Sequence, residues 1–137
     1  MPTFPDLRVT ERSKVKRVPK RAAYDRATVD AILDAGLMCH VGYVIDGAPY
    51  VTATCYWRHG DRVYWHGSAA SRMLRTVTGG VPVCFTVSHL DGLVMARSGF
   101  HHSVNYRGVT LFGEAVKIED PAEKLATLKD FTDRLTP

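Results

Sequence analysis

The sequence lacks long apolar runs and is poor in cysteine, and each absence excludes a class of protein. No hydrophobic stretch approaches the roughly 20 residues that a membrane-spanning helix needs. The N-terminal part has no apolar core of the kind found in secretion signals. The cysteines Cys39, Cys55 and Cys84 show no C-x-x-C spacing, and their odd number argues against a disulfide framework. We therefore expect a cytoplasmic protein with free thiols, and Cys39 and Cys84 lie in apolar runs typical of a core.

Common catalytic and metal-binding motifs are also missing. The sequence has no G-x-S-x-G nucleophile elbow, no H-E-x-x-H pattern and no paired cysteine site. Its six histidines are scattered, and the neighbours His101 and His102 would point in different directions on a regular strand. The pattern therefore identifies no acid–base catalyst and predicts no metal site.

The chain of 137 residues, 45% hydrophobic and 23% charged, is typical of one globular domain. Much of its net charge of +4 lies in residues 12–21. Because prolines oppose regular structure there, we expect residues 1–23 to form an irregular basic arm and residues 24–137 to form the domain. The arm has no aromatic residues interleaved with its basic ones, which favours a solvated arm, lying across a partner subunit, over nucleic-acid binding.

Alternating apolar residues predict a mainly β protein. Asp46-Gly47 and Asp91-Gly92 are each typical of a two-residue hairpin turn. About six strands joined mostly by hairpins favour an antiparallel barrel-like domain. The expected strands span residues 38–45, 49–57, 62–66, 81–90, 93–98 and 105–118.

Two helices with clear end signals should flank these strands. Asp25 or Thr28 is expected to cap a short helix that ends at Gly36. Asp120 followed by Pro121 has the capping pattern of a final helix. The expected inner face of that final helix consists of Leu125, Leu128, Phe131 and Leu135.

The most informative stretch joins a predicted strand, residues 62–66, to a predicted helix, residues 69–78. Free amides at a helix start favour an anion, and Ser68, Ser71 and Arg72 add hydroxyl and guanidinium donors. The pattern indicates a phosphate site or, equally, a helix with a serine cap and a solvated arginine. It matches neither the G-x-G-x-x-G nor the Walker pattern, so the residues alone leave both interpretations open.

A second polar cluster, residues 97–107, contains two arginines and two adjacent histidines between predicted strands. It is either an exposed polar loop or a second wall of the same ligand pocket, reaching across a dimer interface. His66 is the histidine that we single out, because it ends the predicted strand beside the anion site.

Several short segments, taken together from Arg17 onward, carry a specific order and spacing. They are Arg17-Val18-Pro19, Ala23-Tyr24-Asp25, Cys39-His40-Val41-Gly42-Tyr43, Gly47-Ala48-Pro49-Tyr50-Val51, Tyr64-Trp65-His66-Gly67-Ser68, Ser71-Arg72, Leu90-Asp91-Gly92-Leu93-Val94, Ala96-Arg97-Ser98 and His102-Ser103-Val104-Asn105-Tyr106-Arg107. This series resembles the pyridoxamine 5′-phosphate oxidase-like, FMN-binding split-barrel family, and within it the nitroimidazole-resistance (Nim-type) reductases.

The resemblance implies a mainly β (α+β) fold, a six-stranded antiparallel split β-barrel with short flanking helices. It also implies a homodimer with FMN at the subunit interface. In such relatives one strand lies along the isoalloxazine ring, the strand–loop–helix stretch holds the phosphate and ribityl chain, and a later segment approaches the flavin from the partner subunit. The implied cofactor-binding residues are Val51, Thr52, Ala53 and Thr54 beside the ring, His66, Gly67, Ser68, Ser71, Arg72 and Met73 around the phosphate and ribityl chain, and Asn105 and Arg107 in the later segment.

The implied activity is that of a flavin-dependent oxidoreductase with a small-molecule electron donor and acceptor, and without nucleic-acid or membrane partners. Met73 stands where oxidases of the family carry lysine, and the C-terminal segment that binds pyridoxamine phosphate is absent, so vitamin B6 oxidation is not expected. Some split barrels bind haem, which gives the alternative of a haem-binding or haem-handling protein with His66, His101 or His102 as axial ligand. A deazaflavin-binding relative and a non-catalytic flavin-binding module are further alternatives.

Overall fold

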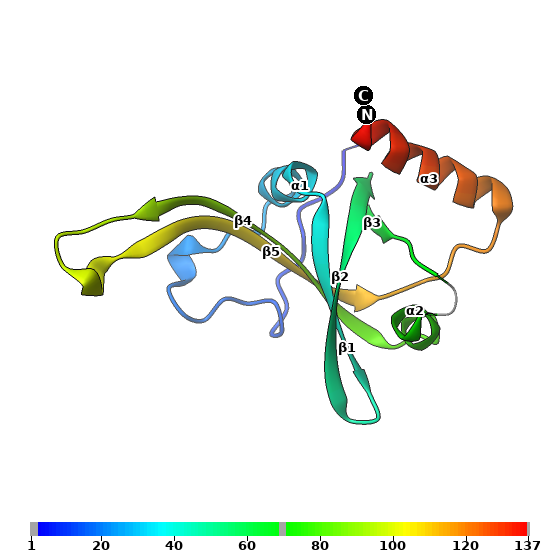
Figure 1. The fold of residues 1–137 in the computed structure, drawn as a ribbon, viewed down its shortest axis with the longest axis horizontal. Helices are drawn as coiled ribbons and strands as arrows, with labels where there is room; N and C mark the ends of the chain where they lie inside the picture. Colours follow the sequence, from blue (N-terminus) through cyan, green and yellow to red (C-terminus); the bar gives the residue numbers. More distant parts are fainter. Residues whose placement is uncertain (1–2, 69–70, 137) are drawn as a thin grey trace.

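The computed structural model describes residues 3–68 and 71–136, in which antiparallel strands predominate (Figure 1). Within these residues the strands form one five-stranded sheet in the order β3-β2-β1-β4-β5, and all neighbours are antiparallel. The strands are β1 (Met38–Ile45), β2 (Ala48–His59), β3 (Arg62–Trp65), β4 (Pro82–Val94) and β5 (Ser103–Glu114).

The helices begin at the caps that the sequence predicts. The carboxylates of Asp25 and Asp120 each accept an amide proton at 3.0 Å, which confirms the expected starts of the first and last α-helices. No helix in the described part of the chain is long and apolar enough to cross a membrane. The helices are η1 (Pro19–Arg21), α1 (Arg26–Ala35), α2 (Arg72–Val77), η2 (Gly99–His101) and α3 (Pro121–Leu135).

The two Asp-Gly pairs adopt different structures. Because only the first forms a hairpin turn, the described residues contain five strands rather than the expected six. Asp46 and Gly47 have positive φ angles of 49° and 79° and form the tight turn between β1 and β2. Asp91 has no positive φ, and β4 continues past it with a register shift between Leu90 and Gly92. The residue pair is therefore a β-bulge rather than a hairpin turn. The true connection from β4 to β5 contains η2.

The core lies between the sheet and the first two α-helices. Alternation places Cys39, Val41 and Tyr43 of β1 in it, and Val83, Phe85 and Val87 of β4 in it as expected. Cys39 is fully buried, as expected, whereas Cys84 is only half-buried and Cys55 is exposed. The remaining core residues are Val29 and Leu33 of α1, Tyr56 of β2, Met73 and Val77 of α2, and Val109 of β5.

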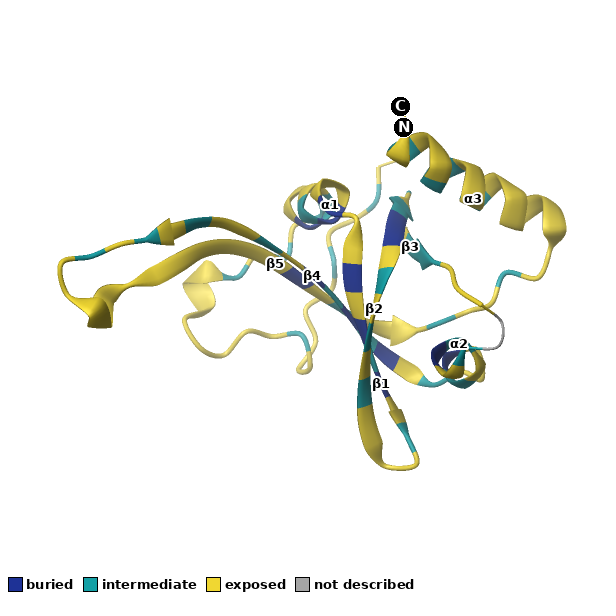
Figure 2. Ribbon diagram, viewed as in Figure 1, coloured by how far each residue is buried: buried dark blue, intermediate teal, exposed yellow. Residues whose placement is uncertain are grey.

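The outer parts of β4 and β5, together with η2, form a long two-stranded arm that extends away from the core (Figures 1 and 2). We call residues 89–107 the β4–β5 arm. Its apolar side chains are largely exposed, and Phe100 at its end is 92% exposed. Exposed apolar surface of this extent is typical of an interaction site. The other strongly exposed apolar residues of the arm are Leu90, Leu93, Met95, Val104 and Tyr106.

Helix α3 packs on β2 through fewer residues than its amphipathic pattern indicates. The Phe131 ring stacks on Trp57 with 5.0 Å between ring centroids, but Leu125 is 71% exposed and Leu135 is 47% exposed. The expected inner face of four residues is therefore only partly buried. The helix leans on the sheet through its C-terminal half, and Figure 1 shows its first turns standing clear of the strands.

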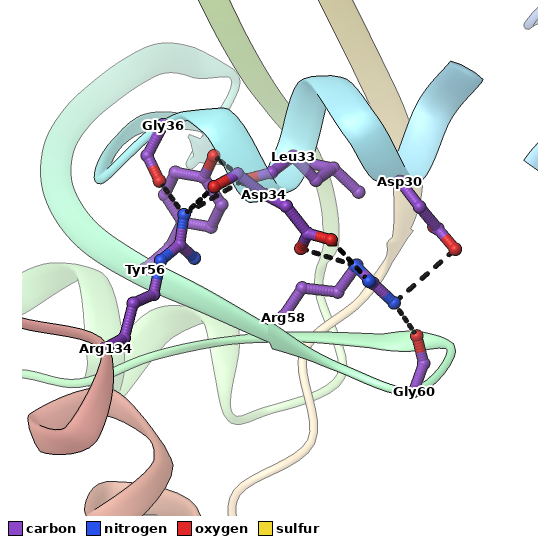
Figure 3. Close-up of polar contacts among 8 residues, drawn as sticks. All are labelled: Asp30, Leu33, Asp34, Gly36, Tyr56, Arg58, Gly60 and Arg134. Carbon is purple, nitrogen blue, oxygen red and sulfur yellow. Dashed lines mark hydrogen bonds and ion pairs between the residues drawn. The ribbon is translucent and has the colours of Figure 1, made fainter. Parts of the chain in front are cut away.

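Side chains from two elements, β2 and α3, secure the C-terminal end of α1 (Figure 3). Arg134 of α3 donates to the carbonyl oxygens of Leu33, Asp34 and Gly36, and the Tyr56 hydroxyl donates to the Leu33 carbonyl at 2.5 Å. The last carbonyls of a helix have no partner within the helix, so these donors supply what α1 lacks. They also tie α1 and α3 to β2.

Arg58 of β2 forms the second half of this network. Its guanidinium donates to both carboxylate oxygens of Asp34 at 2.8 and 2.6 Å and to the Gly60 carbonyl at 2.5 Å, and it lies 3.5 Å from Asp30. Hydrogen bonding to Asp34 raises the pKa of Arg58. A two-bond arginine–carboxylate contact is geometrically specific, so it sets the angle between α1 and β2.

We expect Arg58→Ala to lower the free energy of unfolding by about 2 kcal/mol, because it removes charge-assisted bonds that are only partly exposed. Chemical denaturation measures the change. Lys129→Ala is the matched control, since it breaks the exposed Lys129–Asp133 pair and should leave the denaturation midpoint unchanged. Equal effects of the two substitutions would contradict this account of the α1–β2 contact.

We expect the thiols of Cys39 and Cys55 to differ in reactivity. Burial raises the pKa of Cys39 to about 12, so this thiol stays protonated and inert in the folded protein, whereas Cys55 is exposed. A thiol reagent at about pH 8 should modify Cys55 quickly in the native state and Cys39 only after denaturation. The Cys55→Ala variant should lose the fast phase. A fast phase that survives in this variant at the Cys39 thiol would show that β1 is not packed as described.

Candidate functional site

A groove lies where β1 and β2 meet the segment that leads into α2. Its volume of about 530 Å³ is in the range of small-molecule sites. We call it the Arg72 groove. It is lined by Tyr43, Tyr50, Thr52, Ala53, Thr54, His66, Gly67, Ser71, Arg72 and Met73.

Arg72 places an uncompensated positive charge in this groove. Its guanidinium carbon lies 5.5 Å from the centroid of the Tyr50 ring, a cation–π contact. Tyr50 in turn stacks on its cross-strand partner Tyr43 at 5.8 Å, with an angle of 12° between the rings. Among the described residues, Arg72 forms no ion pair. The groove is therefore electrostatically suited to an anion.

Hydroxyl groups supply further polar contacts along the groove. The Tyr43 hydroxyl and Thr52 Oγ1 are 2.9 Å apart, and the Ser71 hydroxyl accepts the Leu74 amide proton at 3.0 Å. The Ser71 proton is still available to donate to a ligand, because that hydroxyl acts only as acceptor in its cap. Thr54 adds a second threonine from β2.

Helix α2 is shorter than the sequence predicts, and this changes which group would attract an anion. It starts at Arg72 rather than at position 69, and it has only six residues. Positions 69 and 70 lie outside the described residues. So short a helix has a small macrodipole, so the guanidinium of Arg72 is the main source of positive potential.

His66 separates the Arg72 groove from a second hollow on the other side. Its ring lies 6.0 Å from Trp57 and 5.3 Å from Phe131, centroid to centroid. The second hollow, of about 1080 Å³, is bounded by β3, α2, α3 and the chain after β5. His66 and Gly67 line both spaces. The two hollows therefore meet at this point.

The structure brings together most of the site residues expected from the sequence. The exceptions are Val51 and Ser68, which do not line the groove, and Asn105 and Arg107, which lie on the β4–β5 arm. Val51 is 70% exposed. The expected residues that do line it are Thr52, Ala53, Thr54, His66, Gly67, Ser71, Arg72 and Met73.

Arg107 is engaged with Asp91 on the arm rather than with the groove of its own chain. Its guanidinium donates to the Asp91 carboxylate at 2.9 and 3.0 Å, which lowers the pKa of Asp91 and raises that of Arg107. The expected contact of Asn105 and Arg107 with a ligand through a partner subunit stays a prediction.

Sequence reasoning missed the two aromatic residues that define the groove wall. Tyr43 and Tyr50 flank the tight β1–β2 turn and lie opposite each other in the register. The strand alternation had already placed Tyr50 on the same face as Thr52 and Thr54. Their role could therefore have been inferred from the hairpin register together with that alternation.

Solved structures give two close likenesses. The chain is 48% identical to the flavocytochrome Anf3 from Azotobacter vinelandii, with a TM-score of 0.85, over 92% of this chain and 58% of that chain. It is 39% identical to the FAD and heme binding protein from Mycobacterium smegmatis, with a TM-score of 0.77, over 82% of this chain and 55% of that chain. The chain thus spans little more than half the length of these two relatives.

A third solved structure shows the same fold at lower identity. It is a putative 5-nitroimidazole antibiotic resistance protein from Bacteroides thetaiotaomicron, 23% identical with a TM-score of 0.69, over 82% of this chain and 67% of that chain. The likeness to Nim-type proteins expected from the sequence is therefore weaker than that to the flavocytochrome. No curated protein matches the chain.

The family model described as pyridoxamine 5′-phosphate oxidase matches residues 25–137, which include every strand and α-helix named above. The antiparallel sheet and the likenesses of 48% and 39% agree with that match. The chain belongs to the pyridoxamine 5′-phosphate oxidase-like split-barrel family.

Proposed function

We propose that this chain is a flavin-binding redox domain that holds the flavin phosphate in the Arg72 groove. The observation that carries the proposal is the guanidinium of Arg72, which faces the groove without an ion-pair partner among the described residues. Phosphate is, with carboxylate, a ligand group that this planar donor can bind through two parallel hydrogen bonds. The Ser71 hydroxyl beside it adds a donor.

The rest of the groove fits the other parts of a flavin. Thr52 and Thr54 of β2 supply hydroxyls along one wall, and Tyr43 and Tyr50 supply a stacked aromatic wall. A bound flavin would supply electron-transfer chemistry that no side chain of the groove provides. The chain's own residues bind the phosphate, orient the ring and cover part of it. Electron donor and acceptor would then be small molecules that reach the open side of the groove.

We infer that the flavin is FAD rather than the FMN expected from the sequence. The support is that a relative at 39% identity is named as an FAD and heme binding protein. Both nucleotides carry a phosphate next to the ribityl chain, so the role proposed for Arg72 is the same for either. Denaturing the purified protein releases its flavin, and chromatography of the released flavin distinguishes FAD from FMN.

We further propose that two copies of the chain pair through the β4–β5 arm. The support is the row of exposed apolar side chains on the arm, from Leu90 to the largely exposed Phe100. In such a homodimer Asn105 and Arg107 of one copy would approach the flavin of the other, which agrees with their distance along the arm from their own groove.

We expect Arg72→Ala to weaken FMN and FAD binding about tenfold or more, because it removes the charge-assisted bonds to the phosphate. Equilibrium dialysis with each flavin measures the affinity. Arg21→Ala is the control of equal charge change, since Arg21 is exposed in η1. If Arg72→Ala binds flavin as tightly as the wild type, the phosphate lies elsewhere and the proposed site is wrong.

Haem binding is the second candidate, because one close relative is named a flavocytochrome and the other a FAD and heme binding protein. Of the three histidines expected as axial ligands, the structure disfavours His102. His102 Nδ1 accepts the Ala96 amide proton at 3.0 Å, so its Nε2 carries the proton in the neutral ring and has no lone pair for iron. His66 and His101 make no such hydrogen bond among the described residues.

We expect the protein to develop a Soret band with haemin, and His66→Ala or His101→Ala to abolish or shift that band. His102→Ala is the matched control, since it removes a neighbouring imidazole that is already engaged. Visible spectroscopy after gel filtration gives the readout. A wild type that retains no haem, or a band lost only in His102→Ala, would contradict this candidate.

A further inference from the structure

We propose that the second hollow binds the adenosine end of FAD, with Arg75 holding the phosphate nearer the adenosine. The inference rests on the proposed flavin site and adds to it a separate subsite, which we call the Arg75 hollow. It lies between β3, α2 and α3 and has a volume of about 1080 Å³. FMN ends at its single phosphate, so only a dinucleotide flavin would extend into it.

The two spaces adjoin at His66 and Gly67. Both are lined by His66 and Gly67, so a ligand anchored at Arg72 can extend past this point into the Arg75 hollow. A Cβ atom at Gly67 would lie 3.3 Å from Leu74 Cδ1, closer than ordinary contact. The absence of a side chain at Gly67 therefore leaves room beside Leu74 and lets the backbone approach a ligand closely.

Two arginines of α2 stand on the same side of the helix. Arg72 and Arg75 are three residues apart, so their side chains are neighbours on the helix surface. Arg72 lines the groove and Arg75 lines the hollow. Neither forms an ion pair with a described residue. Arg62, Lys117 and Lys124 also line the hollow, but Arg75 is the basic residue on α2 beside Arg72, so this pair is the one placed to contact two linked phosphates.

The walls of the Arg75 hollow suit the uncharged part of an adenosine. Trp65 of β3 provides aromatic surface for a flat base, whereas Tyr64 points to the other face of the strand and stacks on Trp57. Glu119 and Glu123, on the opposite wall, provide carboxylates that can accept hydrogen bonds from the ribose hydroxyls and the adenine amino group. Lys117 and Lys124 lie close to these carboxylates along the chain and offset their charge, so the neighbourhood of Arg72, rather than repulsion, favours Arg75 for the phosphate.

Affinities for FAD and FMN, measured by equilibrium dialysis on the same protein, test this assignment. We expect the wild type to bind FAD at least about tenfold more tightly than FMN, and ADP to compete with FAD. Arg75→Ala should weaken FAD binding about tenfold and leave FMN binding unaltered, because FMN has no group in the hollow. Arg75→Lys should restore most of the FAD affinity, since it keeps the charge.

The outcomes separate this inference from the proposed function. Equal wild-type affinities for FAD and FMN, or loss of both flavins in Arg75→Ala, would overturn the adenosine subsite and leave the Arg72 site standing. Failure of the wild type to bind either flavin would overturn both. Thr127→Trp, on the α3 wall of the hollow, offers a second check, because its bulk should weaken FAD binding and spare FMN.

Discussion

The charge of Arg72, which forms no ion pair with any described residue, is the feature on which the proposed site depends. A guanidinium without a carboxylate partner remains available to a ligand, and its position over the Tyr50 ring holds it at the mouth of the groove. Tyr50 is itself fixed by its stack on Tyr43, and Tyr43 by its hydroxyl contact with Thr52. The tight β1–β2 turn thus orients the cation through three consecutive side-chain contacts. This arrangement would let a short helix suffice at the proposed anion site.

The remainder of the fold keeps β2 in place. Arg58 and Tyr56 on β2 and Arg134 on α3 all bind groups at the C-terminal end of α1, so one helix end connects three elements. Because Thr52 and Thr54 lie on the same strand, the network positions the groove wall from a distance. The β4–β5 arm touches this helix only at its base, where a ring nitrogen of His89 lies 2.9 Å from the Ile32 carbonyl oxygen, and the exposed apolar surface beyond is consistent with a role between subunits.

Local sequence signals predicted the parts of the structure that local physics controls. The caps at Asp25 and Asp120 could be predicted because the position of a helix start depends on the side chain immediately before it. The hairpin turn predicted at residues 91–92 was wrong. The same dipeptide forms a turn at residues 46–47, where both residues have positive φ, but at residues 91–92 the strand continues in its long-range pairing with β5. Arg72 could be predicted as a site residue from the residues next to it in the sequence. Tyr43 depends on a cross-strand contact that requires the register.

A crystal structure of the protein grown with FAD would test the central claim most directly. The account predicts phosphate density within hydrogen-bonding distance of the Arg72 guanidinium, next to the Ser71 hydroxyl, with the isoalloxazine ring along β2. A flavin bound elsewhere on the chain, with Arg72 still lying over Tyr50 and no phosphate beside it, would contradict the account.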